Sequence, residues 1–137
     1  MYNRVTEAEI AALQAISGKN NVLFGKDISP DYAHDELGGI ERMPEALVRV
    51  HSTEEVSAVM ALAWNRNIPV TVRGSGTGLV GAAVPVEGGI LLETTKMNKI
   101  LSLEYEPSRE KMSAAAKKAD LIKQADEIIG FNYKNPE

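Results

Sequence analysis

The glycine-rich stretch at residues 71–90, TVRGSGTGLVGAAVPVEGGI, is the part of the chain whose residue types and spacing could do chemistry. It holds six of the eleven glycines in the chain. Successive glycines let neighbouring backbone N–H groups converge into a concave nest, which binds phosphate oxygens. Arg73 could add a cation, and Ser75 and Thr77 could add hydroxyl donors. The stretch is typical of a pyrophosphate clamp, and the pattern leaves open a ligand-free turn between two strands.

Two other phosphate motifs fit the stretch less well. GTGLVG at residues 76–81 matches G-x-G-x-x-G, the dinucleotide fingerprint, but that mechanism requires a helix to begin in the loop. Pro85 and the pair Gly88–Gly89 leave no room for such a helix. The loop of nucleotide triphosphatases ends in G-K-S/T, and no lysine lies in the stretch.

The remaining chemically reactive residue types give no second candidate site. The chain has no cysteine, which excludes disulfides, thiolate nucleophiles and cysteine metal sites. His51 comes just before a helix cap and is expected on the surface, and no role for His34 follows from its setting. Asp35, Glu36 and Glu41 resemble a solvated loop more than a metal site.

The composition is that of one globular domain of 137 residues, with 44% hydrophobic and 25% charged residues. A net charge of −4 and a pI near 5.3 argue against a nucleic-acid or anionic-membrane partner. The N-terminus lacks a signal-type apolar run, and no stretch approaches about 20 consecutive apolar residues. We therefore expect a cytoplasmic chain without a membrane span.

Cap residues and hydrophobic periodicity predict the elements that position the glycine stretch. Thr6 with Glu9, and Ser52 with Glu55, are capping-box patterns that begin helices. The strand, helix and strand from residue 46 to residue 72 form a βαβ unit, whose two strands should be a parallel pair. The predicted elements are helices at 7–17 and 53–66 and strands at 22–24, 46–50, 68–72, 90–94 and 99–104.

The character of the chain changes at Pro107. Residues 109–129 predict one long amphipathic helix, ended by Gly130. Such a helix would pack on its own domain or on a second copy, and docking to a partner protein is the alternative. The predicted fold class is therefore α+β, a small sheet with flanking helices and a long C-terminal helix.

Three stretches together resemble a known family. They are YAHDEL at 32–37, RMPEALVRVHSTEEVSAVMALA at 42–63 and IPVTVRGSGTGLVGAAVPVEGGILLETTKMNKIL at 68–101. Residues 3–104 resemble the N-terminal part of the FAD-binding domain of FAD-linked oxidases, the PCMH-type or vanillyl-alcohol-oxidase superfamily. Within it, the chain is most similar to the FAD subunits of bacterial D-lactate and glycolate dehydrogenases. The resemblance implies the first subdomain of the PCMH-type FAD-binding fold.

The resemblance also implies the cofactor and its contacts. In the family, the loop that matches residues 73–79 wraps the FAD pyrophosphate with its backbone amides, and the chain runs near the adenine where Pro44 lies. Because this loop contains no histidine, FAD would be bound non-covalently. No catalytic or metal-binding residue is implied. The implied cofactor-binding residues are Pro44, Val72, Arg73, Gly74, Ser75, Gly76, Thr77, Gly78 and Leu79.

The chain departs from the family after residue 105. The family's second glycine-rich segment and its substrate domain have no counterpart, since no glycine cluster follows Gly89. We expect residues 1–105 to be an N-terminal FAD-binding subdomain and 106–137 a helical tail that diverges from the family. The chain would then be truncated relative to the family. Half of a clamp should bind FAD weakly or not at all, because each net hydrogen bond contributes only about 1 kcal/mol.

The function implied is that of an FAD-binding fragment of a flavin-dependent 2-hydroxy-acid dehydrogenase of lactate or glycolate type, inactive alone. One alternative is a subunit that completes its flavin site with another chain or as a homodimer. The other is a non-catalytic interaction module with a relict flavin loop. The sequence leaves open whether the chain is itself an enzyme.

Overall fold

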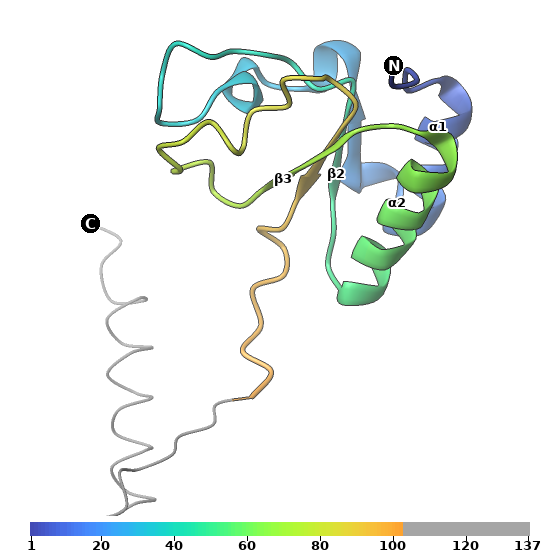
Figure 1. The fold of residues 1–137 in the computed structure, drawn as a ribbon. Coiled ribbons are helices and arrows are strands. Elements are labelled where there is room, and N and C mark those ends of the chain that lie inside the picture. The colour runs from blue at the N-terminus through green and yellow to red at the C-terminus, as the bar shows by residue number, and fades with distance from the viewer. Residues whose placement is uncertain (103–137) are drawn as a thin grey trace, which may run out of the picture. The chain divides into compact units, whose positions relative to one another are not determined.

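The computed structural model of the chain describes residues 1–102 (Figure 1). Two α-helices and four strands are connected by short 3₁₀ turns and by two longer loops. The helices are α1 (Glu7–Ser17) and α2 (Thr53–Arg66), and the strands are β1 (Val22–Phe24), β2 (Ala46–Arg49), β3 (Val70–Arg73) and β4 (Ile90–Glu93). The 3₁₀ turns are η1 (Lys19–Asn21), η2 (Gly25–Asp27) and η3 (Pro30–Ala33).

The four described strands form one sheet in the order β1-β2-β4-β3. β1 is antiparallel to β2, whereas β4 is parallel to both β2 and β3. The strands predicted at 46–50 and 68–72 are therefore parallel, as expected, but they are not direct neighbours, because β4 lies between them. All four residues of β4 are buried, as expected for a central strand covered on both faces.

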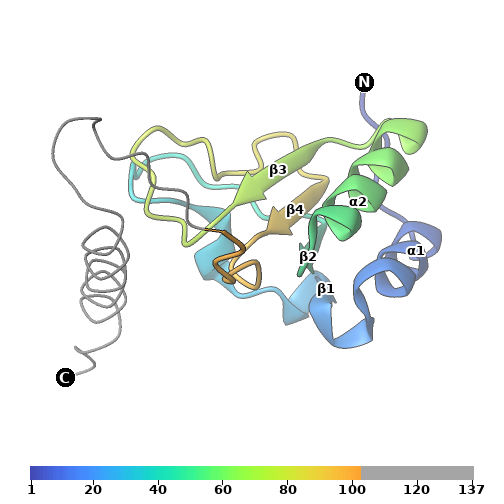
Figure 2. The same cartoon turned by 90° about the horizontal axis from the view of Figure 1, so that it is seen from below.

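The two faces of the sheet are covered by different parts of the chain. Both helices lie on the same face (Figure 2), where Leu13 of α1 and Val59 of α2 pack in one core with Val48 and Leu92. On the other face, Ile28 packs with Leu47 and Leu91. Alternate residues of β2 and β4 thus enter different cores, which places the segment around η3 opposite the helices.

Local cap chemistry sets both helix starts as predicted. Thr6 and Glu9 form the complete capping box of α1. At α2 the Ser52 hydroxyl accepts the Glu55 N–H at 3.2 Å. The Glu55 carboxylate accepts the N–H of His51 at 3.1 Å instead of that of Ser52, so the second half of this capping box is shifted by one residue.

The structure confirms some of the other predicted elements and contradicts one. Strands at 22–24, 46–50, 68–72 and 90–94 are confirmed to within two residues. Residues 99–102 form no strand, so the strand predicted at 99–104 is wrong as far as the structure describes it. The predicted helix at 109–129 and the boundary at residue 105 lie outside the described residues. Within residues 1–102, no helix is long and apolar enough to cross a membrane.

Candidate functional site

The loop at residues 74–89 connects the carboxyl end of β3 to the amino end of β4. Figures 1 and 2 both show it beside the segment that follows η3. The Glu36 N–H donates to the Gly78 carbonyl at 3.1 Å, which joins the two segments. No helix begins in the loop, which confirms the argument against a Rossmann fingerprint. The loop is therefore held on one side by the segment that follows η3, and it contains no helix terminus.

The backbone N–H groups of residues 74–79 are the main chemical feature of this loop. None of these six groups donates to another residue within the part of the chain that the structure describes. Every residue of the six except Gly76 is exposed. The Gly78 carbonyl faces Glu36, and the peptide bond that follows it is trans. The Leu79 N–H therefore points away from the segment that follows η3. The loop thus offers a run of unpaired backbone donors.

The glycines of the loop have two different reasons to be glycine. Gly76 has a φ of +80°, and a Cβ there would lie 2.1 Å from Arg73 Nη2. Gly74 and Gly78 have φ values outside the left-handed region. A Cβ at Gly74 would meet no atom within 4 Å, and a Cβ at Gly78 would meet only Asp35 Oδ2, at 3.7 Å. The fold therefore requires glycine at position 76. At positions 74 and 78 the fold would accept a side chain, so glycine is needed there only if another group must come close to the backbone.

Arg73 lies behind the loop, and its side chain is buried. Its guanidinium donates to the carbonyls of His34 at 2.6 Å and Asp31 at 3.1 Å and stacks 5.4 Å from the centre of the Tyr32 ring. These contacts tie the start of the loop to η3. The expected contact of this guanidinium with a ligand phosphate stays a prediction, since two of its nitrogens are already bound to carbonyls.

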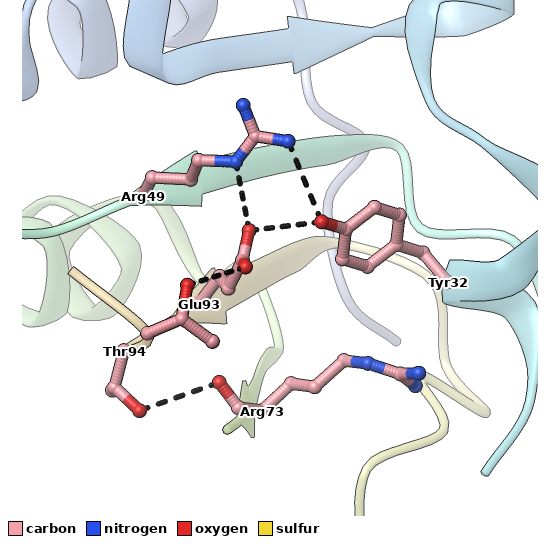
Figure 3. Close-up of polar contacts among 6 residues, drawn as sticks. Tyr32, Arg49, Arg73, Glu93 and Thr94 are labelled. Atoms are coloured by element: carbon pink, nitrogen blue, oxygen red, sulfur yellow. Dashed lines mark hydrogen bonds and ion pairs between the residues drawn. The ribbon is translucent and has the colours of Figure 1, made fainter. Parts of the chain in front are cut away.

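A polar cluster that sequence reasoning missed lies at the carboxyl ends of β2 and β4 (Figure 3). Glu93 Oε2 accepts hydrogen bonds from Arg49 Nε at 2.9 Å and the Tyr32 hydroxyl at 3.1 Å, and Oε1 accepts from the Thr95 hydroxyl at 2.6 Å. Burial raises the pKa of Glu93, but the hydrogen bonds from Thr95, Arg49 and Tyr32 together outweigh it and hold the pKa below its usual value. The carboxylate is therefore a stable anion in the fold.

A hollow of about 240 Å³ lies between this cluster and the start of the loop. It is at the carboxyl end of the parallel strands, where open α/β sheets bind their ligands. Its lining carries hydroxyl groups from three different segments of the chain. The lining residues are Asp31, Tyr32, Arg73, Gly74, Ser75, Glu93 and Thr95.

Asp35 contradicts the expectation of a solvated acidic loop. Its side chain is buried, with the residue only 5% exposed. Oδ1 accepts the Leu37 N–H at 3.1 Å, and Oδ2 has no hydrogen-bond partner among the described residues. Glu36 and Glu41 are exposed, as expected. The tripeptide His34–Asp35–Glu36 carries no sequence signal that separates the buried acid from its exposed neighbour.

The other predicted cofactor-binding residues are not all brought together. Val72 and Leu79 are exposed, and the Ser75 and Thr77 hydroxyls lie 3.2 Å apart at the loop. Pro44 is buried just before the amino end of β2, whereas the loop leaves the carboxyl end of β3, so these positions lie at opposite ends of the sheet.

His34 and His51 are both exposed. No group of three or more histidines, cysteines and acids that could hold a metal occurs in residues 1–102.

Comparison with known proteins identifies the family. Residues 44–131 match the family described as FAD binding domain, and the chain belongs to this family. The resemblance inferred from the glycine stretch is thereby confirmed. The matched range begins at Pro44, contains β2 to β4 with the glycine loop, and extends beyond residue 106.

Curated relatives share much of this chain. It is 43% identical over 127 residues to a D-lactate dehydrogenase of Anaerostipes hadrus, covering 91% of this chain and 26% of that protein. It is 31% identical over 102 residues to the glycolate oxidase subunit GlcD of Bacillus subtilis, covering 74% and 22%. The chain thus spans about a quarter of the length of these relatives.

Solved structures support the fold. A p-cresol methylhydroxylase matches with a TM-score of 0.60 and 29% identity, over 73% of this chain and 21% of that one. An alkyldihydroxyacetonephosphate synthase matches with a TM-score of 0.64 over 75% of this chain and 21% of that one. At 23% identity, the second match shows the shared fold alone.

Proposed function

We propose that the loop at residues 74–79 binds FAD non-covalently through its pyrophosphate. The observation that carries the proposal is the run of six backbone N–H groups without a partner in the described chain. Phosphate oxygens are acceptors only, so a donor-only loop is complementary to them. Membership of the FAD-binding family supports this choice among phosphate-bearing ligands.

Different residues of the loop have different roles in the proposed binding. The open space at Gly74 lets phosphate oxygens approach the backbone, and the Ser75 and Thr77 hydroxyls can donate as well. Arg73, from behind, holds the loop against η3. FAD, when bound, supplies the hydride-accepting ring, and this chain binds and orients it. No histidine lies in the loop, which agrees with non-covalent binding.

The affinity of the chain alone should be low. Five or six amide contacts at about 1 kcal/mol each are largely offset by lost translational and rotational freedom. We propose that further polypeptide completes the site, because the match to the D-lactate dehydrogenase relative covers only 26% of that protein.

We further propose that the completed protein is a flavin-dependent dehydrogenase of 2-hydroxy acids, of lactate or glycolate type. The support is the identity to a D-lactate dehydrogenase and a glycolate oxidase subunit. FAD held at residues 74–79 would supply the hydride acceptor for that oxidation, and the hydroxyl proton of the acid would pass to a base. No residue among 1–102 is assigned to that step, and the chain alone is expected to be inactive.

The test of FAD binding uses variants that the fold tolerates. Flavin fluorescence and calorimetry would follow titration of the purified chain with FAD, with Gly74→Val and Gly78→Ala beside the wild type. We expect each variant to weaken binding at least tenfold while its free energy of unfolding stays near that of the wild type, since a Cβ at Gly74 meets no atom within 4 Å and one at Gly78 meets only Asp35 Oδ2, at 3.7 Å. Ser57→Ala, at an exposed position on α2, serves as the control. Absence of saturable binding by the wild type at millimolar FAD would refute the proposal.

A further inference from the structure

The buried side chain of Asp35 has an acceptor that nothing in the described chain uses. Its Oδ2 atom is inaccessible to solvent and lacks a partner, although Oδ1 is bound to the Leu37 N–H. A buried polar atom without a partner destabilises a fold, and more so when it belongs to a carboxylate. A stability cost of this kind is typical of functional sites.

The position of Oδ2 connects it to the glycine loop. The nearest atom to a Cβ built on Gly78 is Asp35 Oδ2, at 3.7 Å. The next residue, Glu36, donates its N–H to the Gly78 carbonyl, so the two backbones are held side by side. The Gly78 N–H itself has no acceptor among residues 1–102. An unpaired acceptor therefore lies close to a residue whose N–H has no partner among residues 1–102.

We propose that Asp35 is a positioning residue for the loop, and that its Oδ2 accepts the Gly78 N–H when a pyrophosphate occupies the neighbouring amides. This inference rests on the proposed function of the loop. Pairing only in the occupied form relieves the unpaired acceptor of the free form, so occupancy is favoured by the difference between the two states. Asp35 acts through the backbone and does not touch the ligand.

Removal of the carboxylate charge separates this role from simple electrostatics. A negative charge beneath an anion site repels the anion, so by Coulomb's law alone Asp35→Asn should strengthen phosphate binding. Positioning predicts the opposite, a weakening of about tenfold or more, the range of a lost hydrogen bond to a charged group. Glu36→Gln is the matched control, because it removes the same charge from an exposed neighbour and keeps the backbone bond to Gly78.

The experiment is an NMR titration of the ¹⁵N-labelled full chain with FAD and, separately, with inorganic pyrophosphate, each into the millimolar range. We expect Asp35→Asn to weaken both ligands alike and to leave the free chain at least as stable as the wild type. The Gly78 amide resonance should move downfield on binding in the wild type and in Glu36→Gln but not in Asp35→Asn.

Three outcomes would overturn the inference while FAD binding by the wild type stands. They are unchanged affinity in Asp35→Asn, weakening for FAD but not for pyrophosphate, and a large loss of stability of the free variant. The second would mean that Asp35 meets a hydroxyl or amino group of the ligand. If the wild type binds neither ligand, the proposed function fails as well, and the inference fails with it.

Discussion

Gly76→Ala should destabilise the fold strongly, whereas Gly74→Ala two residues earlier should not. A Cβ at Gly76 would lie 2.1 Å from Nη2 and 2.5 Å from Cζ of Arg73, and the residue has a φ of +80°. The left-handed backbone costs about 1 to 2 kcal/mol for a residue with a Cβ. Displacing the guanidinium would lose its two hydrogen bonds to carbonyls, each worth about 1.5 kcal/mol or more.

The expected loss at Gly76 is therefore about 4 to 6 kcal/mol, a large part of the 5 to 15 kcal/mol that is usual for a domain. Gly74→Ala meets no atom within 4 Å and should change stability by about 1 kcal/mol or less. Urea unfolding followed by circular dichroism would measure both. The single tryptophan, Trp64, is 86% exposed and is therefore a poor reporter of unfolding. A Gly76→Ala chain within 1 kcal/mol of the wild type would refute this account of the loop.

Three further predictions follow from single contacts. Because the pKa of Glu93 is held below its ordinary value of 4.5, its share of the stability is present above that pH and is lost as pH falls through the lower folded-state value. Glu93→Gln should cost about 1 to 3 kcal/mol at pH 7 and flatten this acid limb in unfolding curves recorded against pH. Gly78→Ser places a hydroxyl within reach of Asp35 Oδ2 and should raise the unfolding midpoint in urea, while Gly78→Ala, which lacks the donor, should not; equal midpoints would contradict the geometry. Ser52→Ala removes the N-cap of α2 and should cost about 1 kcal/mol by the same assay, and no loss would show that the Glu55 N–H finds another acceptor.

Local chemistry explains why much of the fold could be predicted. The ends of α1 and α2 depend on cap residues within three or four positions of the bonds they make, such as Thr6 and Ser52. The absence of a helix after β3 follows from Pro85 and the nearby glycines, which restrict the backbone locally. The glycine run itself was enough to indicate a phosphate loop and the family, because its spacing is a property of consecutive residues.

The arrangement behind the loop could not be read from the chain, because it depends on residues far apart in sequence. β4 enters the sheet between β2 and β3, since its four residues are apolar enough, with Glu93 paired, to be buried on both faces. That placement brings Glu93 to Arg49, 44 residues away. The sequence by itself determined the helices, the glycine loop and the family. Only the tertiary structure decided that Asp35 is buried and that Arg73 braces the loop, because burial and partners are set by packing across the sheet.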